Sequence, residues 1–117
     1  MITLYEYPQC TTCRKGKKYL SGSGIDFTAH DMVKNPPGAD TLKGIIEQSD
    51  YSVDDFFNKR GKKFKDLGLK ETLDDMTLDE KLELLSSDGM LIKRPLLVTD
   101  DTVVLGFKEE AYEAAVR

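Results

Sequence analysis

The sequence predicts an α/β fold, in which helices pack on a mixed four-stranded sheet. Three observations carry this prediction. The chain starts with a strand–helix–strand pattern and ends with a strand–strand–helix pattern, and the stretch between them has helical patterning. With 117 residues the chain has about the commonest size for one domain, so we expect a single core.

The strand–helix–strand unit covers residues 2–30. Residues 2–7 are rich in β-forming side chains, and Pro8 ends this strand. A helical pattern begins at Thr11 and ends at two glycines, and residues 25–30 then alternate with the period of two that is typical of a strand. Two strands joined in this way should be parallel, with a right-handed crossover.

The middle of the chain is expected to be helical. Residues 42–46 place three aliphatic side chains on one helical face, and residues 53–57 predict a second short helix. Thr77 and Glu80 form a capping box, because each can satisfy a backbone N–H group near the other. The helix that this box opens is expected to carry three leucines on its apolar face: Leu78, Leu82 and Leu85.

The last part of the chain predicts a hairpin followed by a helix. Two short apolar strands, residues 96–98 and 103–105, flank a segment rich in turn-forming residues. Residues 108–116 predict an amphipathic helix with two glutamates in its first turn, where the helix dipole favours negative charge.

The order of these patterns is that of a thioredoxin-like fold with a helical insertion. We assign residues 1–117 to a single thioredoxin-like domain. Its core comprises about residues 1–38 and 89–117, and the insertion comprises about residues 39–88.

Composition and charge limit the classes of function. Hydrophobic residues make up 39 % of the chain and charged residues 32 %, as in a soluble globular domain. The net charge of −4 argues against direct binding to nucleic acid, which usually needs a basic face. No apolar run approaches the roughly 20 residues of a membrane span, and the N-terminus lacks the basic region of a signal peptide. We therefore expect a cytoplasmic protein, a monomer, with no membrane contact.

The chain has two cysteines, Cys10 and Cys13, in one short motif. A disulfide between them would close almost no loop and would stabilise the fold little. A structural zinc site usually needs four ligands, which the cysteines and the lone His30 do not supply, so we expect no metal. His30 is expected to have a structural role. Reactive thiol chemistry is the remaining interpretation, with two inert buried thiols as its alternative.

Cys10 is predicted to lie at the start of a helix, where unpaired N–H groups and the helix dipole favour the thiolate. Arg14, Lys15 and Lys17 are expected to add positive charge. Such surroundings can lower a cysteine pKa from about 8.5 to roughly 3.5–7.5. Cys13 lies one helical turn later, within reach for a disulfide. A C-x-x-C motif after a strand in such a unit is typical of thiol redox proteins.

Two basic segments are further candidates. Pro95 cannot donate a backbone hydrogen bond, so it would leave an open face for an extended substrate, and its peptide bond is a candidate for the cis form. Arg94 would hold an anion with its two-pronged guanidinium. Arg60, within the basic run of residues 59–63, would reach the thiol and bind an oxyanion or a glutathione carboxylate. The alternative is that both segments are ordinary solvated surface.

Several segments together resemble a known family, which comprises the glutaredoxin-coupled arsenate reductases, the transcriptional regulator Spx and the YffB/YusI-like proteins. The resemblance covers essentially the whole chain and is closest to the YffB/YusI-like branch. The segments that carry it are Cys10-Thr-Thr-Cys13-Arg14-Lys15, Phe57-Asn58-Lys59-Arg60-Gly61, Leu67-Gly68-Leu69, residues 87–95 and Gly106-Phe107.

The resemblance implies roles for individual residues. Cys10 matches the nucleophilic cysteine, and Arg60 and Arg94 match arginines that bind the oxyanion, with Cys13 as the candidate resolving thiol. Further substrate-binding residues would be Thr11, Thr12, Arg14, Pro95 and Lys108. The chain departs from the reductases in two places. Many members have Gly-Thr or Gly-Ser where it has Thr11-Thr12. No arginine occupies the last hairpin, where Lys108 is only a loose substitute, and this departure argues against arsenate as the physiological substrate.

Two functions follow from the resemblance. The first is a thiol-dependent reductase with no bound cofactor, which uses glutathione or glutaredoxin as co-substrate. The second is a redox-sensing regulator of the Spx type, which binds the C-terminal domain of the RNA polymerase α-subunit. Regulators of that branch are longer at the C-terminus, so we expect the reductase.

Overall fold

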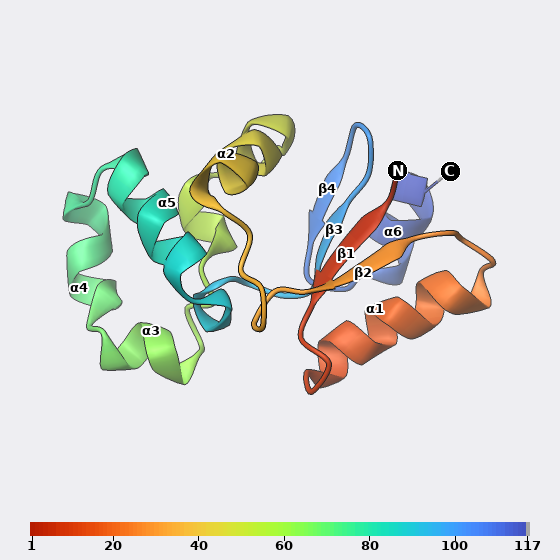
Figure 1. Ribbon diagram of the computed structural model, residues 1–117, viewed down its shortest axis with the longest axis horizontal. Helices are drawn as coiled ribbons and strands as arrows, with labels where there is room; N and C mark the ends of the chain where they lie inside the picture. The colour runs from red at the N-terminus through yellow and green to blue at the C-terminus, as the bar shows by residue number, and fades with distance from the viewer. Residues whose placement is uncertain (117) are drawn as a thin grey trace.

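A computed structural model describes residues 1–116 of the protein (Figure 1). Four strands form one sheet in the order β2-β1-β3-β4. Their bounds are Thr3–Glu6 for β1, Thr28–Asp31 for β2, Leu96–Val98 for β3 and Val103–Leu105 for β4. β1 pairs with β2 in parallel and with β3 antiparallel, and β3 and β4 form an antiparallel hairpin. The predicted mixed four-stranded sheet and the thioredoxin-like fold are therefore confirmed.

Helices cover both faces of the sheet (Figure 1). One face carries α1, Thr11–Gly22, and α6, Glu109–Val116. The other faces the segment predicted as an insertion, whose α-helices are α2 (Ala39–Gln48), α3 (Lys62–Asp66), α4 (Leu69–Thr72) and α5 (Leu78–Ser87). Three short 3₁₀ helices complete that half: η1 (Val53–Phe56), η2 (Leu73–Asp75) and η3 (Gly89–Leu91).

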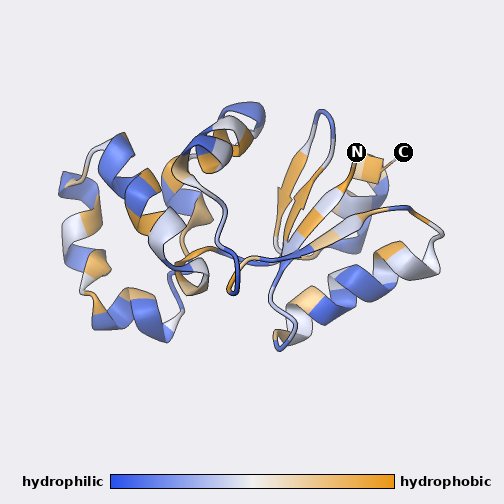
Figure 2. Ribbon diagram, viewed as in Figure 1, coloured by the Kyte–Doolittle hydropathy of each residue, from blue (hydrophilic) through white to orange (hydrophobic). Residues whose placement is uncertain are grey.

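The sheet separates two hydrophobic cores, because successive side chains of a strand point to opposite faces. Leu4, Leu97 and Val104 pack with Leu20 of α1 and Tyr112 of α6. On the other face, Leu96, Val103 and Leu105 pack with the helices of residues 39–91. Figure 2 shows apolar residues along β3 and β4 and many hydrophilic residues along the helices.

Three details differ from the sequence prediction. β2 starts at Thr28 and not at Ile25, because the Ile25 N–H donates to the Leu20 carbonyl and belongs to the end of α1. Phe57 lies outside the short helix, in a β-bridge with Ile92. Leu78 is 46 % exposed, because it is the first residue of α5 and precedes the buried face of that helix.

Two helices were not predicted, α3 and α4. They have five and four residues, and Gly68 joins them with φ +65°. This left-handed conformation is readily accessible only to glycine. No helix among residues 1–116 has the length and apolar character needed to span a bilayer.

Candidate active site

Cys10 is the N-cap residue of α1, with extended backbone angles of φ −84° and ψ 123°. The strand β1 ends at Glu6, and the Cys10 N–H closes the following turn by donating to the Tyr7 carbonyl at 2.9 Å. The Cys13 N–H donates to the Cys10 sulfur at 3.4 Å. A sulfur at this position therefore takes the place of the oxygen that caps most helices.

Cys13 lies one turn further along α1 and is fully buried. Its sulfur accepts a hydrogen bond from the Tyr7 N–H at 3.5 Å. Both cysteines are free thiols in this structure. Burial raises the pKa of the Cys13 thiol to about 12, and its hydrogen bond to the neighbouring Cys10 sulfur adds to this shift. Cys13 therefore remains a thiol at neutral pH and donates its proton toward Cys10.

Arg94 lies beside the two cysteines, next to a cis peptide bond between Arg94 and Pro95. Its guanidinium lies over the Tyr7 ring, 5.4 Å from the centroid. One terminal nitrogen donates to the carbonyls of Met90 at 3.3 Å and Ile92 at 3.5 Å. The buried Nε atom has no hydrogen-bond partner within residues 1–116.

The pKa of the Cys10 thiol lies below its ordinary value. Partial burial raises this pKa, but four stabilising interactions of the thiolate outweigh that effect. They are the hydrogen bond from the Cys13 thiol, the backbone hydrogen bonds from Cys13 and Thr12, and the positive charge of Arg94. Because only the thiolate is a strong nucleophile, Cys10 is the more reactive cysteine of the pair. The direction of this shift agrees with the sequence prediction.

The predicted source of positive charge was wrong. Arg14 is exposed, and its Nε donates to the Pro8 carbonyl at 2.8 Å. Lys17 forms an ion pair with Glu6 at 3.3 Å. The charged group that lowers the Cys10 pKa is Arg94 instead. The side chains on the outer faces of α1 point into solvent, and the packing of a distant segment brings the effective cation to the thiol.

The other predicted site residues are Thr11, Thr12, Pro95, Arg60 and Lys108. Thr11 and Thr12 are exposed at the first turn of α1, and Pro95 is buried at the entry to β3. Arg60 is exposed and lines a cavity of about 420 Å³ together with Lys59 and Lys93. Within residues 1–116, no hydrogen bond or ion pair joins the side chain of Arg60 or Lys108 to either cysteine.

His30 has a structural contact, since its Nε2 atom lies 2.7 Å from the Asn35 carbonyl oxygen. Among residues 1–116 no three His, Cys, Asp or Glu side chains come together in a way that could hold a metal ion.

Two aromatic residues of the site were missed by sequence reasoning. Tyr7 supplies the N–H for Cys13 and the ring beneath Arg94. Tyr112 is fully buried behind Cys13, and its hydroxyl donates to the Gly106 carbonyl at 2.9 Å. Burial raises the Tyr112 pKa, and the proximity of Cys13 raises it further. The sequence signal for the Tyr112 contact was Gly16, a glycine on the buried face of α1. The structure explains this glycine, because a Cβ there would lie 3.2 Å from the Tyr112 hydroxyl.

Several known proteins are similar in sequence to this chain over most of its length. Protein YusI of Bacillus subtilis (strain 168) is 46 % identical over 96 % of this chain and 95 % of its own length. The regulatory protein MgsR of the same organism is 35 % identical over 91 % of this chain and 82 % of its own. The global transcriptional regulator Spx of Lactiplantibacillus plantarum is 28 % identical, covering 94 % of this chain and 82 % of its own.

Among solved structures, a possible arsenate reductase from Streptococcus mutans UA159 superposes with a TM-score of 0.85. It is 46 % identical, and the match covers 92 % of each chain. The model of the ArsC family matches residues 5–115, which is nearly the whole sequence and includes both cysteines and Arg94. The chain therefore belongs to the ArsC family.

Proposed function

We propose that the protein is a thiol-dependent oxidoreductase in which the Cys10 thiolate attacks an oxyanion or a mixed disulfide. The observation that carries this proposal is the set of donors around the Cys10 sulfur. One thiol, two backbone N–H groups and one guanidinium favour its charged form. Thiolate chemistry of this kind needs neither a general base nor a bound cofactor.

With a glutathionylated substrate, the Cys10 thiolate forms a new S–S bond to the glutathione sulfur, and the substrate sulfur leaves as a thiolate, which is the reduced product. A second thiol then attacks the mixed disulfide between Cys10 and glutathione. If Cys13 attacks, a Cys10–Cys13 disulfide results, and two glutathione molecules or a glutaredoxin dithiol reduce it. If glutathione attacks instead, it forms oxidised glutathione directly and Cys13 is a spectator.

Arg94 would attract the anionic substrate through the positive charge of its guanidinium, beside the Cys10 sulfur. Arg60 would hold a more distant carboxylate or oxyanion from the neighbouring cavity, and the first turn of α1 at Thr11 and Thr12 would face the substrate. We expect a mixed disulfide rather than arsenate, because the last hairpin lacks an arginine. We place this activity in the cytoplasm, where glutathione keeps thiols reduced, and expect the protein to act as a monomer.

A glutathione-coupled assay with a glutathionylated peptide as substrate tests the proposal. Cys10→Ser should abolish turnover, because it removes the nucleophile. Cys13→Ser should retain turnover if glutathione resolves the mixed disulfide, and lose it if Cys13 does. Full activity of Cys10→Ser would refute the reductase.

The second candidate function is redox-dependent regulation by binding RNA polymerase. Its support is the similarity to MgsR and Spx over more than nine-tenths of this chain. In this scheme, the Cys10–Cys13 disulfide would change the affinity for the C-terminal domain of the α-subunit. Titrating the purified domain into oxidised and into reduced protein tests the scheme. Absence of binding in both states would exclude it.

A further inference from the structure

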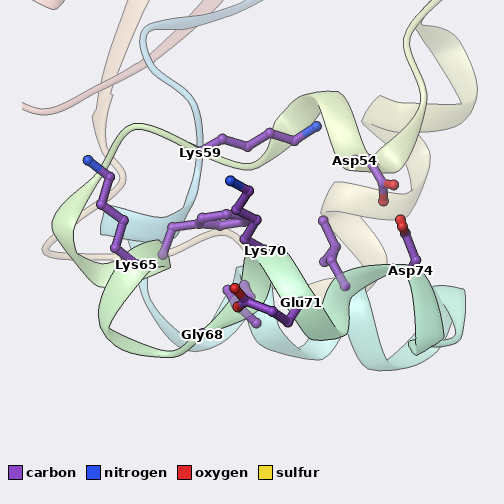
Figure 3. A pocket seen from close by; sticks show the side chains of 10 residues that line it. Asp54, Lys59, Lys65, Gly68, Lys70, Glu71 and Asp74 are labelled. Carbon is purple, nitrogen blue, oxygen red and sulfur yellow. The ribbon is translucent and has the colours of Figure 1, made fainter.

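The helical half of the molecule contains a cavity of about 580 Å³ (Figure 3). Neither Cys10 nor Cys13 lines it. It lies between η1, α3, α4 and η2. Its volume is within the range of roughly 300–1,000 Å³ that is typical of small-molecule sites. Neither the thiol chemistry nor the similarity to known proteins gives this cavity a role.

The floor of the cavity is apolar. Phe64, Leu69 and Leu73 line it, and each is only 5 % exposed. Gly68 forms part of the wall between α3 and α4. A Cβ at Gly68 would meet only one atom, the Glu71 Oε2 at 4.0 Å, so no side chain fills this part of the wall. The cavity can therefore accept an apolar body against a preformed surface.

The rim carries three carboxylates, Asp54, Glu71 and Asp74, and three lysines, Lys59, Lys65 and Lys70. Asp54 and Asp74 face each other at one end, toward which Lys59 also extends (Figure 3). Asp54 is paired with Lys81 at 2.7 Å. Glu71 lies on the α4 side of the cavity, below Lys70 (Figure 3). Lys65 and Lys70 extend from α3 and α4, away from that end (Figure 3). Within residues 1–116, neither of these two lysines forms an ion pair with a carboxylate.

We propose that this cavity binds an amphipathic organic anion. The apolar body of the ligand would lie on Phe64, Leu69 and Leu73, and its carboxylate or phosphate would lie between the ammonium groups of Lys65 and Lys70. The three carboxylates on the rim, Asp54, Glu71 and Asp74, disfavour a ligand that carries several anionic groups. A polyanion such as nucleic acid is disfavoured for the same reason, so the matching ligand has one anionic head and one apolar tail.

Titration of decanoate into the ¹⁵N-labelled full chain, below the micelle concentration, tests the proposal by NMR. The backbone signals of residues 64–73 should shift saturably. Decyl phosphate should bind at the same place if the headgroup can be either anion, and inorganic phosphate alone should bind at least tenfold more weakly than decyl phosphate. Decyltrimethylammonium has the same tail with a cationic head, and it should bind at least tenfold more weakly, because Lys65 and Lys70 repel its head.

Variants identify the headgroup contacts. The double substitution Lys65→Gln and Lys70→Gln should weaken decanoate binding about tenfold, whereas Lys43→Gln on the exposed face of α2 should have no effect. All three lysines are exposed, so these variants should fold normally. Equal binding of the anionic and cationic amphiphiles would overturn the proposal, as would unchanged affinity in the double variant. Binding of an acidic, leucine-containing peptide in the absence of decanoate binding would identify a peptide groove instead.

Discussion

Cys10 and Cys13 lie one helical turn apart at the start of α1, yet their pKa values shift in opposite directions because their surroundings differ. Cys10 caps the helix and receives several hydrogen bonds, whereas Cys13 is buried beneath it against Tyr7 and Tyr112. The buried Cys13 thiol keeps its own proton and donates it in a hydrogen bond to the half-buried Cys10 thiolate. At neutral pH, Cys10 is therefore the nucleophile and Cys13 the hydrogen-bond donor. Two predictions follow at the scale of single residues.

Arg94→Gln should raise the Cys10 pKa, because it removes the nearby positive charge. The rate of alkylation by iodoacetamide, measured against pH, should fall several-fold at pH values where the wild-type thiol is already ionised. Lys17→Gln is the matched control, since its charge is paired with Glu6, and it should leave the profile unchanged. Equal profiles for the wild type and Arg94→Gln would show that the guanidinium does not act on the thiol.

Cys13→Ala should also raise the Cys10 pKa, because alanine cannot donate a hydrogen bond to the thiolate. Cys13→Ser keeps a side-chain donor, so the Cys10 pKa of this variant should lie close to that of the wild type. The alkylation profile separates the two variants. If both behave alike, backbone N–H groups and Arg94 stabilise the thiolate without help from the Cys13 side chain.

At the scale of elements, close approach of η3 to the end of β2 determines where the Arg94 segment lies. Gly89 touches the Met32 backbone so closely that a Cβ would lie only 2.0 Å from the Met32 carbonyl oxygen. The bridge between Phe57 and Ile92 then holds the following residues against the helical half. Packing between elements that are distant in sequence therefore brings the guanidinium to the thiol.

Gly89→Ala should destabilise the protein by roughly 3 kcal/mol, because backbone must shift to admit the methyl group. Gly44→Ala is the matched control. Gly44 lies inside α2 with open space around its Cα, so alanine should stabilise the protein by about 0.8–1.0 kcal/mol through helix propensity. Urea unfolding measures both changes. The same sign of effect for both substitutions would contradict the contact at Gly89.

Elements with a clear local pattern could be predicted from the sequence. The boundaries of α1, the capping box of α5, the β3–β4 hairpin and the acidic first turn of α6 all follow from neighbouring residues. α3 and α4 could not be predicted, because helices of five and four residues are too short to show a helical period. The same limit applies to the site. The motif indicates Cys10, Cys13 and Arg94, but the Tyr7 and Tyr112 contacts depend on tertiary packing.

At the scale of the molecule, ionisation of Cys13 couples to unfolding. The unfolded chain loses this proton near pH 9.0, whereas the folded chain keeps it until about pH 12. Between these values the folded state binds more protons, so stability falls as pH rises, by about 1.4 kcal/mol per pH unit from this group. Cys10 does not offset this loss, because its lowered pKa leaves it ionised in both states above pH 9.0.

Urea unfolding of the wild type and Cys13→Ala between pH 8.5 and 11 measures this contribution. Other groups titrate in both proteins, so the difference between the two slopes isolates Cys13. The wild type should lose stability more steeply. Parallel curves would show that the thiol is not protected from ionisation in the folded protein.

The two hydrophobic cores have a consequence for the reactive sulfur. Cys10 is anchored through α1 to one core, while its cation is tethered to carbonyls on the opposite side of the sheet. The sulfur and the cation that lowers its pKa therefore belong to different halves of the molecule, so the Cys10 pKa depends on how these halves are aligned. Loosening of the helical half would leave both cysteines in place but would move Arg94 away and raise the Cys10 pKa. The alkylation rate of Cys10 therefore reports how well the two halves of the molecule are aligned.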